Sequence, residues 1–168
     1  MNTQTRSESG LSWKEVCEDP TLQDLPYKIE TNEYGQIVMS PNYLWHSRAQ
    51  HQLAKRLDQC VEGGEVLTEA AIRTTKGTKV ADVAWFSAAR WDEVREALDA
   101  PIAPEICVEI RSSSNTDEEM AEKRALYVEA GAEEVWICDS QGRLTFFDAD
   151  GERSASTRVP DFPDRIDG

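Results

Sequence analysis

The sequence predicts an α/β domain in which helices flank a central mixed sheet. Segments with strand periodicity alternate with segments of helical periodicity along the 168 residues. Two short runs, VADVAWF and EICVEI, are largely apolar, which is typical of strands buried on both faces. Two capping boxes, Ser12 with Glu15 and Thr116 with Glu119, indicate where helices begin.

Turns and chain breakers order the elements in the first two thirds of the chain. A short helix is expected after Ser12 and ends before Pro20. The polar stretch 32–35 lies between two alternating segments and predicts a β-hairpin. The strands of this hairpin span 27–31 and 36–39, and the next elements expected are a helix over 43–60, strands over 65–73 and 79–86, and a short helix over 90–98.

The remaining third continues the alternation and ends in a polar tail. The elements expected are a strand over 105–110, a helix over 116–130 that ends at Gly131, and strands over 133–138 and 143–148. The tail from Ala149 is rich in Pro, Gly and Asp, so we expect it to add little to the core. A single domain over 1–168 follows, with its core at about 12–148 and extensions over 1–10 and 149–168.

Composition excludes several classes of protein. The chain has 18 basic and 32 acidic residues, a net charge of -14, so it does not coat nucleic acid or anionic membranes by bulk attraction. An enzyme with a local basic groove remains open. The chain lacks a run of apolar residues long enough to span a membrane and a secretory leader, so the expected location is cytoplasmic. Its four cysteines form no CxxC pair and are expected to be buried or half-buried free thiols.

Two acidic residues interrupt strands that are otherwise apolar, Asp82 in VADVAWF and Glu109 in ICVEIR. A buried carboxylate is costly unless it is paired, hydrogen-bonded or bound to a cation. Neighbouring strands could bring these two side chains together, and a divalent ion such as Mg²⁺ would relieve their repulsion. Alternatively, each acid binds backbone amides or a nearby arginine. The pair, followed by a polar turn and a helix, favours a site.

Three further residues are candidates for the same chemistry. Lys123 shares a helix face with Met120 and Tyr127 and would direct its ammonium group towards the strand of Glu109, unless its head simply reaches water. Arg111 follows Glu109 by two residues and so shares its face, where it could stabilise a phosphate. Glu30, in the first strand, either completes the carboxylate cluster or is an exposed acid of an edge strand.

The helix over 43–60 and the serine turn supply weaker candidates. His46 could approach a ligand from the start of the helix and Gln50 shares its face, whereas a surface role is favoured for His51. Trp45, beside His46, is a candidate for stacking on a base. The turn 112–114 could donate hydrogen bonds to a phosphate at a helix start, but it needs no ligand to serve as a helix-entry turn.

Five segments in a fixed order resemble the family of small "putative restriction endonucleases" within the PD-(D/E)XK nuclease superfamily. They are YKIETNEYGQIVMSP, GEVLTEAAI, VADVAWFSAARW, APEICVEIRSSSNT and EKRALYVEAGAEEVWICD. The resemblance covers roughly residues 12–148. It implies a restriction-endonuclease-like PD-(D/E)XK core, with a central mixed sheet flanked by helices and preceded by a helix and a β-hairpin.

The resemblance also implies a role for each matching residue. Asp82 matches the aspartate of the "PD" half-motif and Glu109 the acid of the second half-motif, so both are expected to ligate Mg²⁺, for which Mn²⁺ would substitute. Glu30 matches an acid in the first strand of the family. Two departures stand out: Ala81 replaces the proline of "PD", and Arg111 stands where the superfamily has lysine. Lys123 matches a helix position whose lysine takes over that role.

The leading hypothesis is a Mg²⁺-dependent endonuclease that hydrolyses DNA phosphodiester bonds, with Asp82, Glu109, Lys123, Arg111 and Glu30 as its site residues. A homodimer would suit the cutting of two strands. The alternative from another class is a catalytically inactive module that binds nucleic acid or a protein partner. A basic stripe formed by Lys55, Arg56, Arg73, Lys76 and Lys79 would favour the nuclease, and scattered basic residues the module. A third hypothesis, a hydrolase of small phosphate esters, requires a closed pocket.

Overall fold

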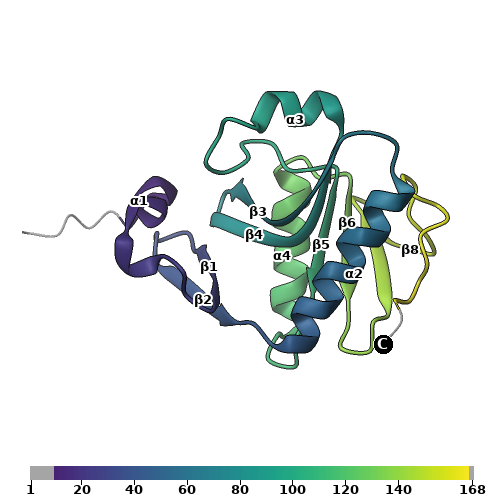
Figure 1. Cartoon of the computed structure of the whole chain (residues 1–168), viewed down its shortest axis with the longest axis horizontal. Coiled ribbons are helices and arrows are strands. Elements are labelled where there is room, and N and C mark those ends of the chain that lie inside the picture. The colour runs from purple at the N-terminus through teal and green to yellow at the C-terminus, as the bar shows by residue number, and fades with distance from the viewer. Residues whose placement is uncertain (1–9, 167–168) are drawn as a thin grey trace, which may run out of the picture.

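The computed structural model describes residues 10–166, which form a six-stranded sheet, a separate two-stranded sheet and helices around them (Figure 1). The α-helices are α1 (Trp13–Glu18), α2 (Leu44–Cys60), α3 (Ala88–Val94) and α4 (Asp117–Glu129), and a 3₁₀ turn lies at Pro20–Leu22. The strands are β1 (Tyr27–Thr31), β2 (Ile37–Pro41), β3 (Glu65–Thr74), β4 (Gly77–Phe86), β5 (Ile106–Ile110), β6 (Glu134–Cys138), β7 (Leu144–Asp148) and β8 (Gly151–Arg153).

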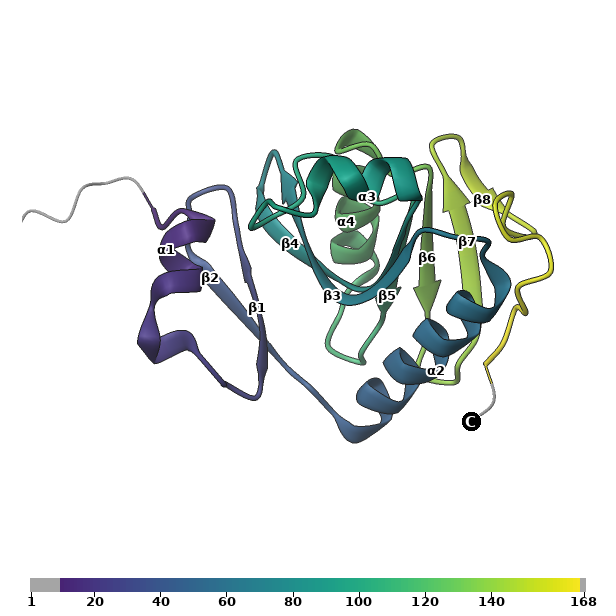
Figure 2. The same cartoon turned by 45° about the horizontal axis from the view of Figure 1, so that its top comes forward.

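The large sheet has its strands in the order β3-β4-β5-β6-β7-β8, and its neighbours are antiparallel except for β5 and β6. A parallel pair needs a long crossover, and α4 supplies it between β5 and β6. In Figures 1 and 2, α2 covers one face of the sheet and α4 lies on the other. The predicted class, a mixed sheet between helices, is therefore confirmed.

The capping residues predicted from the sequence set the helix starts. Both capping boxes form, at Ser12 with Glu15 and at Thr116 with Glu119. The short helix predicted over 90–98 lies instead at Ala88–Val94, because the Ser87 side chain accepts a hydrogen bond from the Arg90 N–H and caps the helix two residues earlier.

The prediction that the tail from Ala149 adds little to the core is wrong. The tail buries Val159, Phe162 and Ile166 in the same cluster as the apolar face of α2. The centroids of the Phe162 and Trp136 rings are 4.7 Å apart. The sequence analysis missed this packing because the three residues are widely spaced in a polar segment. Their burial depends on the surface that α2 and β6 leave open. The tail therefore belongs to the folded domain.

A buried carboxylate fastens the same tail to the sheet. Glu134, at the start of β6, accepts hydrogen bonds from Ser156 Oγ at 2.6 Å and from the backbone N–H groups of Thr157 and Arg158 at 2.9 and 2.8 Å. Trp136 Nε1 donates to the same carboxylate at 2.8 Å. These four donors satisfy the carboxylate where it is removed from water.

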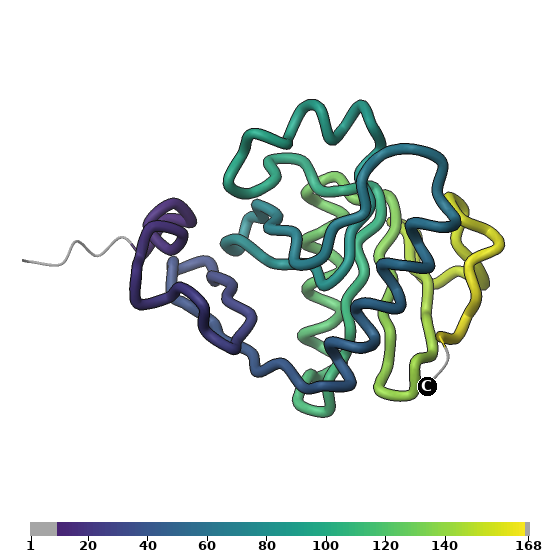
Figure 3. The backbone as a smooth tube through the Cα atoms, in the orientation of Figure 1, coloured from purple at the N-terminus to yellow at the C-terminus, as the bar shows by residue number. Residues whose placement is uncertain are grey.

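The β1–β2 hairpin stands beside the large sheet and is attached to the start of β4, as the chain trace in Figure 3 shows. The Val80 N–H donates to Glu30 Oε2 at 2.6 Å, and the Thr78 N–H donates to Thr31 Oγ1 at 2.8 Å. The approach is so close that a Cβ atom on Gly77 would lie 2.5 Å from the Thr31 carbonyl oxygen. Glycine is required there, and β1 is held where its side chains reach the sheet.

Two smaller features complete the description. Within residues 10–166, no helix is long and apolar enough to cross a membrane. All four cysteines are free thiols, and Cys107 and Cys138 are buried as expected, whereas Cys17 is exposed, contrary to expectation. Residues 1–9 of the predicted extension 1–10, and residues 167–168, lie outside the described residues.

The packing of the tail gives a stability prediction. Phe162→Ala is expected to lower the free energy of unfolding by about 3 kcal/mol, because a large buried ring is replaced by a cavity beside Trp136. Urea unfolding followed by tryptophan fluorescence measures the loss. Arg153→Ala, an exposed change on β8, serves as the control and should stay within about 0.5 kcal/mol of the wild type. A loss below about 1 kcal/mol for Phe162→Ala would contradict the assignment of the tail to the core.

Candidate active site

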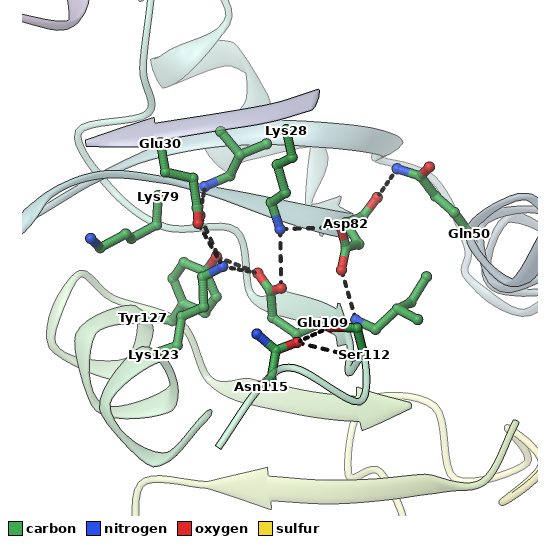
Figure 4. Close-up of polar contacts among 12 residues, drawn as sticks. Lys28, Glu30, Gln50, Lys79, Asp82, Glu109, Ser112, Asn115, Lys123 and Tyr127 are labelled. Carbon is green, nitrogen blue, oxygen red and sulfur yellow. Dashed lines mark hydrogen bonds and ion pairs between the residues drawn. The ribbon is translucent and has the colours of Figure 1, made fainter. Parts of the chain in front are cut away.

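The candidate site is a cleft of about 430 Å³ between the β1–β2 hairpin, the start of α2, the middle of β4, the end of β5, and α4. Figure 4 shows the polar side chains that converge in it. Those from the large sheet are Asp82 and Glu109, and β1 contributes Lys28 and Glu30. Because α4 adds Lys123, three carboxylates and two ammonium groups form one cluster in the cleft, which Lys79, Glu119 and Glu122 also line.

The register of β4 and β5 brings the two predicted acids together. The ladder pairs Val83 with Val108, and its continuation by one residue sets Asp82 opposite Glu109. On the other side of β4, its pairing with β3 is also interrupted. There Glu69 adopts a left-handed conformation, φ +54°, and the pair it would form with Asp82 is missing. Such a break in the ladder can change the direction of a side chain, and breaks of this kind are common next to functional sites.

Lys28 occupies the position between the two acids. Its Nζ lies 3.1 Å from Asp82 Oδ1 and 3.2 Å from Glu109 Oε2, and all three side chains are buried. The two carboxylates are thus directed at one cation. Among the described residues, no group of three His, Cys, Asp or Glu side chains is arranged to hold a metal ion. The sequence analysis did not single out Lys28, because a lysine in an alternating strand resembles an ordinary edge residue.

Lys123 and Tyr127 approach Glu109 from α4, one helical turn apart. The Lys123 Nζ lies 3.3 Å from Glu109 Oε1 and 2.9 Å from Glu30 Oε2. The Tyr127 hydroxyl donates to Glu109 Oε1 at 2.6 Å. The predicted helix face is therefore the one that meets the site, and Glu30 lies in the cluster rather than on an exposed edge.

The start of α2 holds Asp82 from the other side. His46 Nε2 lies 3.4 Å from Asp82 Oδ1, and Gln50 Nε2 donates to the Asp82 backbone carbonyl at 2.9 Å. The backbone N–H of Ile110 donates to Asp82 Oδ2 at 2.7 Å. The buried His46 Nδ1 has no hydrogen-bond partner within the described part of the chain. His46 and Gln50 thus both contact Asp82, and His51 is exposed as expected.

Burial and charge pairing act in opposite directions on the buried groups. Burial raises the pKa of Asp82, but Lys28, His46 and the Ile110 N–H together outweigh it, so this pKa lies below its ordinary value. The pKa of Glu30 is likewise lowered, by Lys123 and Lys28 acting against burial. For Glu109, burial prevails over both lysines and raises the pKa. Burial lowers the pKa of Lys28, but Glu109 and Asp82 together raise it above the ordinary value.

Arg111 does not join the cluster, contrary to the prediction from its spacing. Its Nη1 lies 2.5 Å from Asp117 Oδ1, and its Nη2 donates to the Asn115 backbone carbonyl at 3.1 Å. The strand β5 ends at Ile110, so the alternation that would place Arg111 beside Glu109 stops before it. Arg111 fastens the turn to the start of α4 instead.

The serine turn is held by its own hydrogen bonds, as expected of a helix-entry turn, whereas the proposed basic stripe is divided. In the turn, Ser112 Oγ lies 2.8 Å from Ser114 Oγ, so these hydroxyls bind each other at the rim of the cleft. The basic residues proposed as a stripe are divided: Arg73 pairs with Asp99 and Lys76 with Glu122, while Lys79 lines the cleft and Lys55 and Arg56 line another pocket. A single basic stripe over these five residues is therefore absent.

Comparisons with known proteins identify the family and the fold. A family profile described as "Uma2: Putative restriction endonuclease" matches residues 20–168, which is most of the chain. The chain belongs to the Uma2 family. This confirms the resemblance drawn from the five sequence segments. The Uma2 match also includes the C-terminal tail, which the structure places in the core.

A solved structure agrees with the Uma2 fold. It is described as a putative nuclease belonging to DUF820 from Anabaena variabilis ATCC 29413, and it is similar to this chain with a TM-score of 0.67 and 17% identity. The match covers 82% of this chain and 79% of that chain. At this identity the likeness establishes the fold, and the predicted nuclease-type core is confirmed. A comparison with curated proteins gives no match.

The buried ammonium of Lys28 gives a prediction for the stability of this Uma2 protein. Lys28→Met is expected to lower the free energy of unfolding by about 3 kcal/mol at pH 7, because it leaves buried carboxylates uncompensated. Asp82 and Glu30 have lowered pKa values, so the stability they contribute is present above their unfolded values, about 4, and is lost as the pH falls. The difference between variant and wild type should therefore shrink below about pH 4.

Urea unfolding at pH 7 and pH 3.5 measures this difference. Lys79→Met is the matched control, because Lys79 lines the same cleft but, among residues 10–166, its Nζ donates a hydrogen bond only to the Thr31 carbonyl. Its loss should stay below about 1 kcal/mol at both pH values. Equal stability of wild type and Lys28→Met at pH 7 would show that the ammonium does not hold the carboxylates.

Proposed function

We propose that this chain is a Mg²⁺-dependent endonuclease that hydrolyses DNA phosphodiester bonds. The single observation that carries the proposal is the convergence of Asp82 Oδ1 and Glu109 Oε2 on one cation, the Lys28 ammonium, at 3.1 and 3.2 Å. Membership of the Uma2 family supports the reaction class. The cleft opens beside the hairpin, where a strand of nucleic acid could approach.

The donor set fits a hard divalent ion. Mg²⁺ is usually held by one or two carboxylates and keeps several waters, so Asp82 and Glu109 would suffice as its protein ligands. Such an ion supplies a polarised water and neutralises charge at a phosphoryl centre. Burial raises the pKa values of Asp82 and Glu30, but their charge pairing and hydrogen bonds lower both values overall, so these carboxylates are ionised at neutral pH, the form that binds a divalent cation.

The other side chains have positioning and electrostatic roles in this proposal. Tyr127 and Gln50 hold Glu109 and the backbone of Asp82 in place by hydrogen bonds. Lys123, bound to Glu109 and Glu30, brings a positive charge to the cleft, where it can orient a water or stabilise a phosphate oxygen. A divalent ion held by Asp82 and Glu109 would compete with Lys28 for the same two carboxylates, so the ammonium would have to leave that position.

A second candidate function is favoured by the charge distribution. The net charge is -14, and the basic residues Arg73 and Lys76 are paired with carboxylates rather than exposed in a stripe. An inactive nuclease-fold module that binds nucleic acid or a protein partner would have these features. Only the endonuclease should bind a divalent metal at the acidic cleft and cleave DNA, so assays of metal binding and of cleavage distinguish the two functions.

Metal binding is the first test. Isothermal titration of Mn²⁺ should show binding to the wild type, at least about tenfold weaker binding to Asp82→Asn, and tighter binding to Lys28→Met, which removes the competing ammonium. Lys79→Met, from the rim of the cleft, is the control and should bind like the wild type. Equal affinities of wild type and Asp82→Asn would count against a metal site at these carboxylates.

Cleavage is the second test, and it separates Lys123 from Arg111. With a plasmid and a labelled oligonucleotide in Mg²⁺, Lys123→Met should lower kcat by roughly 10² to 10⁴, the range for loss of a positioned acid–base or charge-stabilising group. Arg111→Gln should retain most activity, because Arg111 is bound to Asp117 outside the cluster. Loss of activity in Arg111→Gln with full activity in Lys123→Met would reverse the assignment.

A further inference from the structure

A second pocket, distinct from the acidic cleft, lies between α2 and the C-terminal tail. Its volume is about 470 Å³, and it is lined by Gln52, Lys55, Arg56 and Gln59 of α2 and by Pro163, Arg165 and Ile166 of the tail. We call this feature the basic pocket. It contains three cationic side chains and no carboxylate in its lining, in a chain whose net charge is -14.

The cations of the basic pocket differ from most others in the chain. Arg73, Lys76 and Arg158 each form an ion pair with a carboxylate. Within residues 10–166, no ion pair joins Lys55, Arg56 or Arg165 to an acidic side chain. Three neighbouring cations that repel one another and lack a counterion are an arrangement that an anionic ligand would stabilise.

The helix α2 connects this pocket to the acidic cleft. Its inner face carries His46, Ala49, Leu53 and Leu57, all buried, and His46 contacts Asp82. Helical spacing places Trp45, Gln52, Lys55 and Gln59 on an adjacent side of the helix, on which Lys55 and Gln59 are exposed. At 1.5 Å per residue, Lys55 lies about 15 Å along the helix from Trp45, which is beside His46 at the cleft. Figure 2 shows α2 running from the hairpin end of the molecule to the C-terminal tail.

We propose that the basic pocket binds backbone phosphates of the nucleic-acid strand whose scissile bond lies in the acidic cleft. The inference deepens the proposed function, on which its choice of ligand rests. A span of about 15 Å corresponds to roughly four nucleotides at the 3.4 Å rise of a strand. Trp45, 36% exposed at the near end of this path, offers a ring on which a base can stack. The pocket thus supplies the local positive surface that a strongly acidic nuclease requires.

The basic pocket can be tested without cleavage. Binding of a fluorescein-labelled 20-nucleotide DNA is followed by anisotropy in EDTA over a series of NaCl concentrations. The variant K55Q/R56Q/R165Q should bind at least about tenfold more weakly, and its salt slope should fall by about 2 to 3, one phosphate contact for each lost cation. The charge-matched control K14Q/R95Q/R153Q changes three exposed, ion-paired cations elsewhere and should bind like the wild type.

Two outcomes of this titration would overturn the proposal. In the first, both triple variants lose affinity equally, which shows that net charge alone governs binding. In the second, K55Q/R56Q/R165Q binds DNA like the wild type but loses the binding of a labelled polyglutamate peptide that the wild type retains, which shows that the pocket serves an acidic protein partner.

Cleavage of two substrates separates this inference from the proposed function. Bis(4-nitrophenyl) phosphate reaches the acidic cleft but is too small to span to the basic pocket. If both proposals hold, K55Q/R56Q/R165Q hydrolyses this ester like the wild type and cleaves the 20-nucleotide DNA with a raised KM. If the wild type hydrolyses neither substrate, the proposed function fails, and the anisotropy result alone decides whether the pocket binds nucleic acid.

Discussion

Burial of three carboxylates at one end of the sheet is the constraint on which the rest of the structure depends. Asp82, Glu109 and Glu30 are each less than a tenth exposed, and a buried carboxylate without a partner is strongly destabilising. Lys28 and Lys123 supply the compensating charge, but they come from β1 and α4. The hairpin, the sheet and the crossover helix must therefore meet at this end of the molecule before the charges are satisfied.

Three of the elements that reach the site each contribute two side chains at their own structural repeat. A strand directs every second residue to the same face, and a helix directs residues four apart to the same side. The pairs are Lys28 and Glu30 on β1, His46 and Gln50 on α2, and Lys123 and Tyr127 on α4. A slip of one residue in any of these elements would remove both members of its pair, so the site depends on the same register as the core.

Local patterns predicted much of the fold and part of the site. The capping boxes, the alternating hairpin and the apolar strands were visible because each depends on residues close in sequence. Asp82 and Glu109 were visible because an acid within an apolar run is unusual. Lys28 was missed because its partners are 54 and 81 residues away. The position of Arg111 was mistaken because the end of β5 is set by pairing with β6, which no local spacing reveals.

By itself, the sequence determined which residues share a face and where most elements begin, since periodicity and capping act over a few residues. The tertiary structure alone decided which faces meet. It placed the Lys28 ammonium between two acids of different strands, and it buried Phe162 of a polar tail against Trp136. Both contacts join residues that are far apart in the sequence. Their partners are therefore set by packing and charge compensation over the whole domain, not by any single segment.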